Sequence, residues 1–173
     1  MYKTKNESFV VGSKILDVIT TGMYSNPYMA LREYIQNAAD AIDERLLIDE
    51  AISNAEMHID ITVDRRNRSI KIVDNATGIS PEHIKERLCS LAISDKDSKR
   101  QRGFRGIGRL GGLSYCEILR FETRDRNHKK VTVVEWDKRK LSDTEQQKLA
   151  HRSIEDAIDG IVTISTRTSN DDE

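Results

Sequence analysis

The chain has 173 residues, with 37% hydrophobic and 33% charged residues and a formal net charge of -1 at pH 7, so we expect one domain over residues 1–173. A charge this close to zero argues against wholesale binding to nucleic acid or to an acidic membrane. Cys89 and Cys116 lie far apart with no C-x-x-C pair, which argues against a disulfide framework or a structural zinc site and favours the cytoplasm. No apolar run approaches the roughly 20 residues of a membrane span, and the N-terminus lacks the apolar core of a signal peptide.

The first half of the chain predicts two helices and a hairpin. Residues 10–19 repeat apolar side chains at roughly helical spacing, which predicts a first helix. A second helix is predicted over residues 27–47, with an extension to residue 53. Residues 57–64 and 69–74 alternate apolar and polar side chains around the turn-like "RRNRS", which predicts a β-hairpin.

The second half predicts a helix, a long loop and further strands. Ser80 is the expected N-cap of a helix whose first position is Pro81. Residues 93–109 are polar, basic and rich in glycine without an apolar face, which is typical of a functional loop, here a lid. Strands are predicted over residues 115–125, 129–137 and 160–168, with a helix-prone segment over residues 141–159. This order favours an α+β fold, a two-layer α/β sandwich with helices on one face of a mixed, mostly antiparallel sheet.

A polar stripe on the second predicted helix raises the question of function. With about 3.6 residues per turn, Glu33, Asn37 and Asp40 fall within a narrow sector of the helix surface. The opposite sector carries the apolar residues expected to dock on a core, which are Leu31, Ile35, Ala38 and Ile42. The stripe is therefore free to be solvated or to serve a function.

The glycine-rich segment does not match the common nucleotide motifs. No G-x-x-x-x-G-K-[ST] pattern occurs, which excludes a P-loop. "GIGRLG" matches G-x-G-x-x-G, but no strand precedes it, so a dinucleotide-binding turn is weakly supported. Backbone amides that approach phosphate oxygens at a helix start would explain its glycines, and a merely flexible loop is the alternative.

A third motif, "IVDNATGIS", ends a predicted strand at Asp74 and then turns. One interpretation is an ordinary Asx-type turn formed by Asp74, Asn75 and Gly78. The other is a buried carboxylate that accepts a hydrogen bond from a ligand amino group, with Gly78 leaving room for a flat ring. This motif alone does not decide between them.

Together, the three motifs resemble those of the GHKL ATPase superfamily, which includes DNA gyrase B subunits, ninety-kilodalton heat-shock chaperones, sensor histidine kinases and MutL-type mismatch-repair proteins. "EYIQNAADA" is similar to the E-x-x-x-N-x-x-D-A helix, "DNATG" to the D-x-G-x-G adenine loop and "GFRGIG" to the lid motif, in the family's order. "YSNPYMALREYIQNAADAID" and "LCSLAISDK" are most similar to the heat-shock chaperones, whereas "RGFRG" resembles the MutL lid.

The resemblance implies a role for each residue of these motifs. Asn37 would bind a magnesium ion that bridges the phosphates of ATP, and Glu33 would activate the attacking water. Asp40 would act through ordered water, and Asp74 would accept a hydrogen bond from the adenine amino group. Further contacts are implied for Gly78, Ile79 and Leu88 at the adenine, and for Gly103, Gly106, Ile107 and Gly108 at the phosphates, where Lys99, Arg100, Arg102 and Arg105 would attract the anion.

Two positions depart from the family pattern. Ala76 replaces the first glycine of the adenine loop, which would strain the loop if that position needs a positive φ. Ile161 stands where many relatives have a threonine, and Thr163 is a substitute in a different register. Both departures bear on nucleotide affinity.

The function implied is the N-terminal ATP-binding domain of a longer heat-shock-chaperone-like ATPase, which hydrolyses Mg-ATP to drive conformational switching. ATP and ADP are the expected ligands, and relatives imply a homodimer of the full-length protein and a following domain that contacts the γ-phosphate. One rival is a DNA-processing or defence ATPase of the MutL or MORC kind, favoured by the basic lid. Another is a nucleotide-binding module without turnover, favoured by Ala76 and Ile161. A histidine kinase is least supported, because Glu33 occupies the base position.

Overall fold

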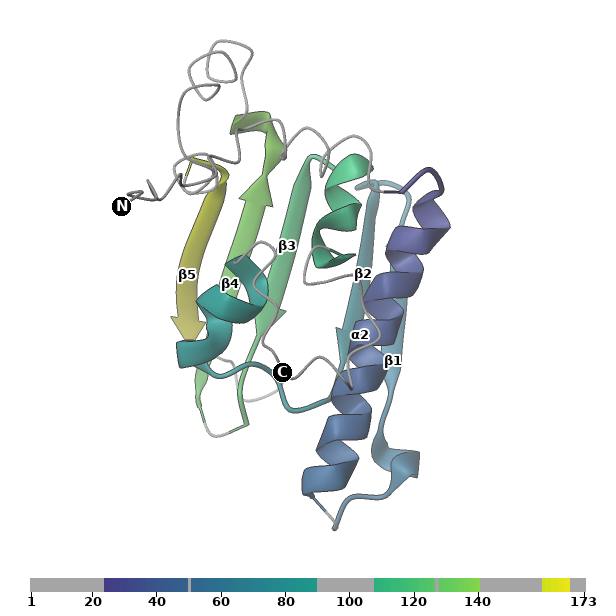
Figure 1. Ribbon diagram of the computed structural model, residues 1–173, viewed down its shortest axis with the longest axis vertical. Coiled ribbons are helices and arrows are strands. Elements are labelled where there is room, and N and C mark those ends of the chain that lie inside the picture. The colour runs from purple at the N-terminus through teal and green to yellow at the C-terminus, as the bar shows by residue number, and fades with distance from the viewer. Residues whose placement is uncertain (1–23, 50, 90–107, 127, 141–159, 169–173) are drawn as a thin grey trace, which may run out of the picture.

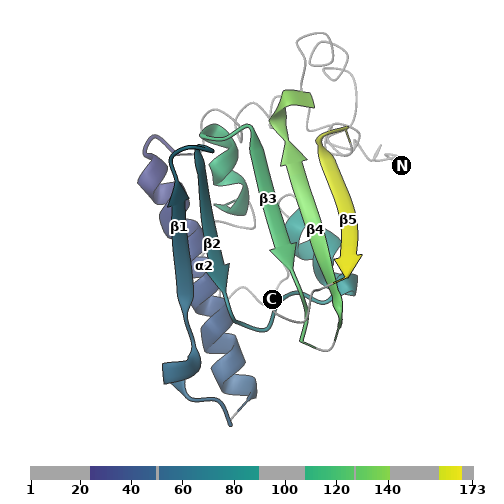
Figure 2. The same cartoon turned by 180° about the vertical axis from the view of Figure 1, so that it is seen from behind.

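The computed structural model describes residues 24–49, 51–89, 108–126, 128–140 and 160–168. Its longer elements are α2 (Pro27–Ile48), β1 (Ile59–Asp64), β2 (Ser69–Asp74), β3 (Ile118–Thr123), β4 (Lys130–Asp137) and β5 (Val162–Thr168). Short helices span Asn54–Glu56, Pro81–His83, Lys85–Cys89, Gly108–Ser114 (η4) and Lys138–Lys140. Helix α2 lies in front of β1 and β2 in Figure 1, and the strands are in front when the molecule is seen from behind in Figure 2. The fold is therefore α+β, with helices on one face of the strands.

The strands form two antiparallel sheets, one of β1 and β2 and one in the order β3-β4-β5. The predicted hairpin is confirmed, with Ile61 opposite Ile72, and the three later strands are confirmed as well. The sequence predicts one mixed sheet, but no hydrogen-bonded ladder joins β2 to β3 in the described residues. These two strands point the same way side by side (Figure 2). Alternating side chains predict a strand but not its distant partner.

Helix α2 begins and ends at identifiable caps. The Asn26 side chain accepts a hydrogen bond from the Tyr28 amide at 2.9 Å, and Pro27 follows at the first helical position. The helix ends at Ile48, so the predicted extension to residue 53 is wrong. Ser53 begins a separate turn instead, because its amide donates to the Glu56 carboxylate at 2.8 Å in a capping box.

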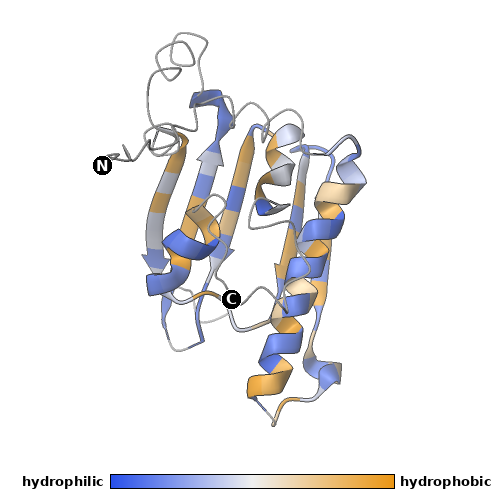
Figure 3. Ribbon diagram, viewed as in Figure 1, coloured by the Kyte–Doolittle hydropathy of each residue, from blue (hydrophilic) through white to orange (hydrophobic). Residues whose placement is uncertain are grey.

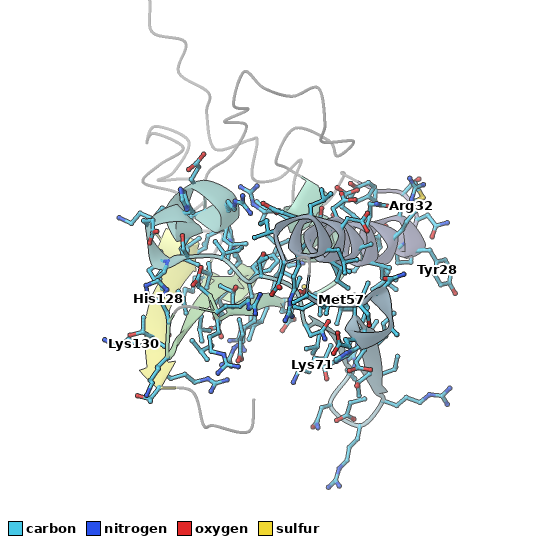
Figure 4. The ribbon with its side chains drawn as sticks, turned by 90° about the horizontal axis from the view of Figure 1, so that it is seen from below. Tyr28, Arg32, Met57, Lys71, His128 and Lys130 are labelled. Atoms are coloured by element: carbon cyan, nitrogen blue, oxygen red, sulfur yellow. The ribbon has the colours of Figure 1, made fainter. Side chains whose placement is uncertain are left out.

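The buried face of α2 is rotated from the predicted one. The predicted burial of Ala38 and Ile42 is confirmed and Leu31 is half-buried, but Ala30 is buried as well, whereas Ile35 is 37% exposed. Tyr34 turns inward in its place, where Gly112 on the adjoining segment leaves room for the phenol. Tyr28 and Arg32 lie on the outer side of the helix, at the opposite end of the molecule from His128 and Lys130 (Figure 4).

The helix predicted after Ser80 forms as a 3₁₀ turn over Pro81–His83 and a π-helical turn over Lys85–Cys89. Ser80 Oγ lies 2.8 Å from His83 Nδ1 rather than capping an amide. These turns cover the three-stranded sheet, whose strands β3 and β4 alternate apolar and polar residues in Figure 3. The core between them consists of Ile84, Leu88, Leu110, Leu113, Val134, Trp136 and Ile161.

Three predicted segments lie outside the described residues. They are the first helix over residues 10–19, most of the lid over residues 93–107, and the helix-prone segment over residues 141–159. In the part of the chain that the structure describes, no helix has both the length and the apolar character needed to cross a bilayer.

Candidate functional site

The end of the glycine-rich motif folds against the first half of α2. Gly108 begins the 3₁₀ helix η4, whose Leu110 and Leu113 are almost completely buried in the core. Helix η4 lies beside α2 in Figure 1, although 60 residues separate Ile48 from Gly108. The apolar anchors thus hold the glycines next to the polar stripe.

Glu33 and Gly108 are in direct contact. A methyl group built on the Gly108 α carbon would lie 2.5 Å from Glu33 Oε1 and 2.8 Å from its Cδ. Glycine is therefore the residue that lets the carboxylate approach the backbone here. The structure brings together two residues that the sequence assigned to different motifs.

Tyr34 ties the same two elements together. Its hydroxyl donates to the Arg109 carbonyl oxygen and accepts from the Gly112 amide, both at 2.8 Å. Its ring contacts Phe121 edge-on, with centroids 6.5 Å apart. Burial raises the pKa of Tyr34, which keeps the hydroxyl protonated and able to donate.

The sequence motifs do not identify Tyr34 or Tyr24 as partners of this segment. A methyl group on Gly112 would lie 2.5 Å from the Tyr34 hydroxyl oxygen, and one on Gly111 would overlap the Tyr24 ring. The signal was the pair of adjacent glycines, which indicates a close approach without naming the neighbour.

The rest of the polar stripe faces solvent. Asn37 and Asp40 are exposed, and Asp40 Oδ1 accepts a hydrogen bond from Gln36 Nε2 at 2.7 Å. Glu33 is half-buried at one end of the stripe. Among the described residues, no three or more His, Cys, Asp or Glu side chains cluster closely enough to hold a metal ion. Asn37 is thus the residue of the stripe with an uncharged oxygen ligand to offer.

Asp74 forms the Asx-type turn that was one of its two interpretations. Its Oδ1 accepts from the Ala76 amide at 3.1 Å, and the residue is exposed rather than buried. Ala76 is not strained, because only Arg68 and Gly78 have a positive φ among the described residues. The expected conflict at the missing glycine therefore does not arise.

Asn75 anchors the loop that follows Asp74. Its Oδ1 accepts from the His58 amide at 3.0 Å, and its Nδ2 donates to the Glu56 carbonyl oxygen at 2.8 Å. Arg45 on α2 donates to the Asn75 carbonyl oxygen. The loop is therefore fixed both to the segment that precedes β1 and to helix α2.

Gly78 contacts protein backbone. With a φ of 70°, it lies so close to the β3–β4 connection that an added methyl group would overlap the Arg124 carbonyl oxygen and lie 2.6 Å from its carbon. The next residue, Ile79, donates its amide hydrogen to Thr123 Oγ1 at 2.9 Å. The backbone of Arg124 occupies the space beside Gly78 on this side, a contact that the sequence motif does not predict.

A pocket opens between the end of α2, the Gly78 loop and the β3–β4 connection. Gly78 and Ile79 are among its lining residues, whereas Asp74 and Leu88 are not. Leu88 is buried in the core, and Ile79 packs partly against that core. The residues that the sequence missed are Glu44, Ile48, Thr77, Ser80, His83, Arg87 and Asp125.

Neither Ile161, which stands where many relatives have a threonine, nor its possible substitute Thr163 lines this pocket. Ile161 is buried in the core with 2% of its surface exposed. Thr163 is exposed on β5, where its hydroxyl accepts from Lys140 Nζ at 3.1 Å. The remaining predicted residues, Gly103, Gly106 and Ile107, lie outside the described residues.

The chain matches a known protein family along most of its length. Residues 24–168 match a profile described as histidine kinase-, DNA gyrase B-, and HSP90-like ATPase. This range contains α2, the Asp74 loop, η4 and all five described strands. The α+β fold with antiparallel sheets is consistent with it.

Individual relatives are bacterial proteins named chaperone protein HtpG. The one from Bacillus licheniformis is 29% identical over 129 residues, which is 69% of this chain and 21% of the relative. The one from Acinetobacter baylyi is 29% identical over 170 residues, which is 87% of this chain and 26% of the relative. The one from Natranaerobius thermophilus is 35% identical over 86 residues, or 47% of this chain. The chain spans between 14% and 26% of the length of these relatives.

Proposed function

The chain belongs to the family of histidine kinase-, DNA gyrase B- and HSP90-like ATPases, and on this premise we propose that it is the ATP-binding domain of a chaperone-like ATPase. It would bind Mg-ATP and hydrolyse it to drive conformational switching. The contact between Glu33 and Gly108 carries the proposal, because it joins a candidate base to a candidate phosphate-binding segment. The similarity to HtpG proteins over up to 87% of the chain supports the chaperone-like assignment.

At the phosphate end, Glu33 is the proposed general base and Asn37 the proposed magnesium ligand. The two side chains lie one helical turn apart, with Glu33 half-buried and Asn37 exposed. An amide oxygen suits Mg²⁺, which usually keeps several waters and takes further ligands from substrate phosphates. The bound ion would neutralise phosphate charge, while Glu33 would orient a water molecule and accept its proton. Asp40 would contact the nucleotide through ordered water.

At the base end, Asp74 is the proposed acceptor for the adenine amino group. A carboxylate has about four acceptor sites, so the bond from the Ala76 amide leaves capacity for a ligand. Gly78 and Ile79 line the pocket beside this loop, and Leu88 would support it from the core. The adenine would enter between α2 and the Gly78 loop.

The glycine-rich motif is the proposed phosphate-binding segment. Gly108 is its described end, and Gly103, Gly106 and Ile107 would complete it with their backbone amides. We further propose that both sheets belong to one layer of a two-layer α/β sandwich, that the full-length protein is a cytoplasmic homodimer, and that a following domain contributes to hydrolysis.

A DNA-processing or defence ATPase is the second candidate. The β1–β2 turn carries three exposed arginines, Arg65, Arg66 and Arg68, in addition to the basic residues of the glycine-rich motif. Arginines on a projecting turn suit a phosphate backbone. Binding to duplex DNA would favour this candidate over the chaperone-like one. The logarithm of the affinity should then fall linearly with the logarithm of the salt concentration, with a slope of about one per phosphate contact.

Calorimetric titration of the chain with ATP and ADP, with and without magnesium, tests the proposed function. We expect one site for each nucleotide, with ATP affinity increased by magnesium and Asn37→Ala removing that increase. Asp43→Asn, an exposed position on the same helix, is the matched control and should bind as the parent does. A folded parent chain that binds neither nucleotide would contradict the proposal.

A further inference from the structure

We propose that Tyr34 is a positioning residue, whose hydroxyl fixes η4 against α2 and thereby sets the contact between Gly108 and Glu33. This inference rests on the proposed function, since it concerns how the candidate base meets the candidate phosphate-binding segment. None of the three sequence motifs that predict this site assigns a role to Tyr34.

The hydroxyl bonds two backbone groups of one short helix. It donates to the Arg109 carbonyl oxygen and accepts from the Gly112 amide, each at 2.8 Å. Arg109 directly follows Gly108, so the first of these bonds lies one residue from the contact with Glu33. One oxygen atom therefore fixes both the start and the middle of η4.

The surroundings of Tyr34 favour this single arrangement. Glycine at position 112 leaves room for the hydroxyl, since a methyl group there would lie 2.5 Å from the oxygen. The Phe121 ring holds the Tyr34 ring edge-on from β3. A backbone amide and carbonyl that lost this partner in a buried segment would have to move toward water or toward each other.

Glu33 and Tyr34 are adjacent in the chain, which couples the anchor to the candidate base. Tyr34 directly follows Glu33, and its bonding partner Arg109 directly follows Gly108. A shift of η4 would therefore move Gly108 relative to the Glu33 carboxylate. A misplacement of about 1 Å in a reacting group can cost roughly 100-fold in rate. Tyr34 itself acts through Glu33 and Gly108 and has no direct contact with substrate in this proposal.

Tyr34→Phe tests the inference, because it keeps the ring against Phe121 and removes only the hydroxyl. In the longest natural form of the protein, we expect kcat for ATP hydrolysis to fall roughly 10- to 100-fold. We expect the affinity for ADP to change less than about twofold, since the adenine end lies elsewhere. Amide hydrogen exchange over residues 108–113 should become faster in the variant, even without nucleotide.

Val131→Ala is the control for a merely structural effect. Val131 is 5% exposed on β4 and lies outside the core cluster that holds η4, so its truncation lowers stability without touching this contact. Its kcat should stay at the parental value even where its melting temperature falls as much as that of Tyr34→Phe. An equal fall of kcat in Val131→Ala, or parental kcat in Tyr34→Phe, would overturn the inference. A parent that binds no ATP would instead overturn the proposed function, which separates the two failures.

Discussion

The Glu33 carboxylate lies against the α carbon of Gly108, close enough that a methyl group there would be 2.5 Å from Oε1. The neighbouring atom is the end of a flexible side chain, so a larger residue at position 108 displaces the carboxylate and leaves the backbone in place. The absence of a side chain at Gly108 therefore determines the position of the Glu33 carboxylate. Two variants test the consequence from opposite sides of the contact.

Gly108→Ala should lower ATP turnover while leaving the fold intact. The methyl group would push the Glu33 carboxylate out of position, whereas the backbone gains the usual stabilisation of about 0.4–1 kcal/mol from replacing glycine at a compatible position. The measurement is kcat together with the melting temperature, and Gly160→Ala, whose methyl group meets nothing within 4 Å, is the control. Parental turnover in Gly108→Ala would show that the position of the carboxylate does not matter.

Glu33→Gln should remove turnover without removing binding. The amide has the same shape as the carboxylate and fits against Gly108, but it cannot accept the proton of the attacking water. The expected loss of kcat is about 10²- to 10⁴-fold. Single-turnover hydrolysis beside ATP titration gives both quantities, and Asp43→Asn on the same helix should match the parent in both. If Glu33→Gln hydrolyses ATP at the parental rate, Glu33 belongs to a solvated face and a binding module without this catalysis is the better account.

Asp74→Asn should weaken nucleotide binding while keeping the loop. The amide oxygen can still accept from the Ala76 amide, so the Asx-type turn is kept. The second carboxylate oxygen, however, is replaced by an NH₂ group, which cannot accept a hydrogen bond from the adenine amino group. Loss of such a contact costs roughly 1–3 kcal/mol, or about 5- to 150-fold in affinity.

The matched control for this variant is Asp64→Asn at the other end of the hairpin. Asp64 Oδ1 likewise accepts from backbone amides, those of Arg66 and Asn67, at 2.9 and 3.0 Å. Both variants therefore keep a comparable turn, and they differ in whether the turn leads into the loop that carries the pocket-lining residues Gly78 and Ile79. Equal affinities for ADP in the two folded variants would remove Asp74 from the site.

Local patterns predicted the elements, and contacts between distant segments escaped prediction. The caps Asn26 and Pro27 and the alternation along β1 and β2 depend on neighbours in the sequence, so helix and hairpin followed from them. Tyr34 illustrates the limit, because its inward position depends on Gly112, which lies 78 residues away. The neighbouring Ile35 is more apolar than Tyr34, yet it is exposed. Which side chain is buried thus depends on the shape of the neighbouring segment, and the sequence does not identify that segment.

Gly78→Ala should destabilise the fold more than any surface substitution. The alanine would be held at a φ of 70° with its methyl group against the Arg124 backbone, which cannot move as a side chain end does. The left-handed conformation costs about 1–2 kcal/mol, and overpacking typically adds about 1–3 kcal/mol. Urea unfolding gives the comparison with Gly160→Ala, for which we expect a change within about 0.5 kcal/mol. A similar stability of the two variants would show that the loop relaxes away from β3.

Alkaline pH should destabilise the parent chain through Tyr34. Burial raises the pKa of Tyr34 above its ordinary value of 10.0, because the folded protein disfavours the phenolate. The unfolded chain therefore ionises first, so the contribution of Tyr34 is complete below about pH 10 and is lost as the pH rises from there toward the raised pKa. In that window the free energy of unfolding should fall by up to about 1.4 kcal/mol per pH unit relative to Tyr34→Phe. Urea unfolding of both at pH 8, 9, 10 and 11 measures the difference, and Val131→Ala, which keeps every titratable group, should follow the slope of the parent. Parallel curves for the parent and Tyr34→Phe above pH 10 would mean that the hydroxyl reaches water, and the anchor between α2 and η4 would then be open in solution.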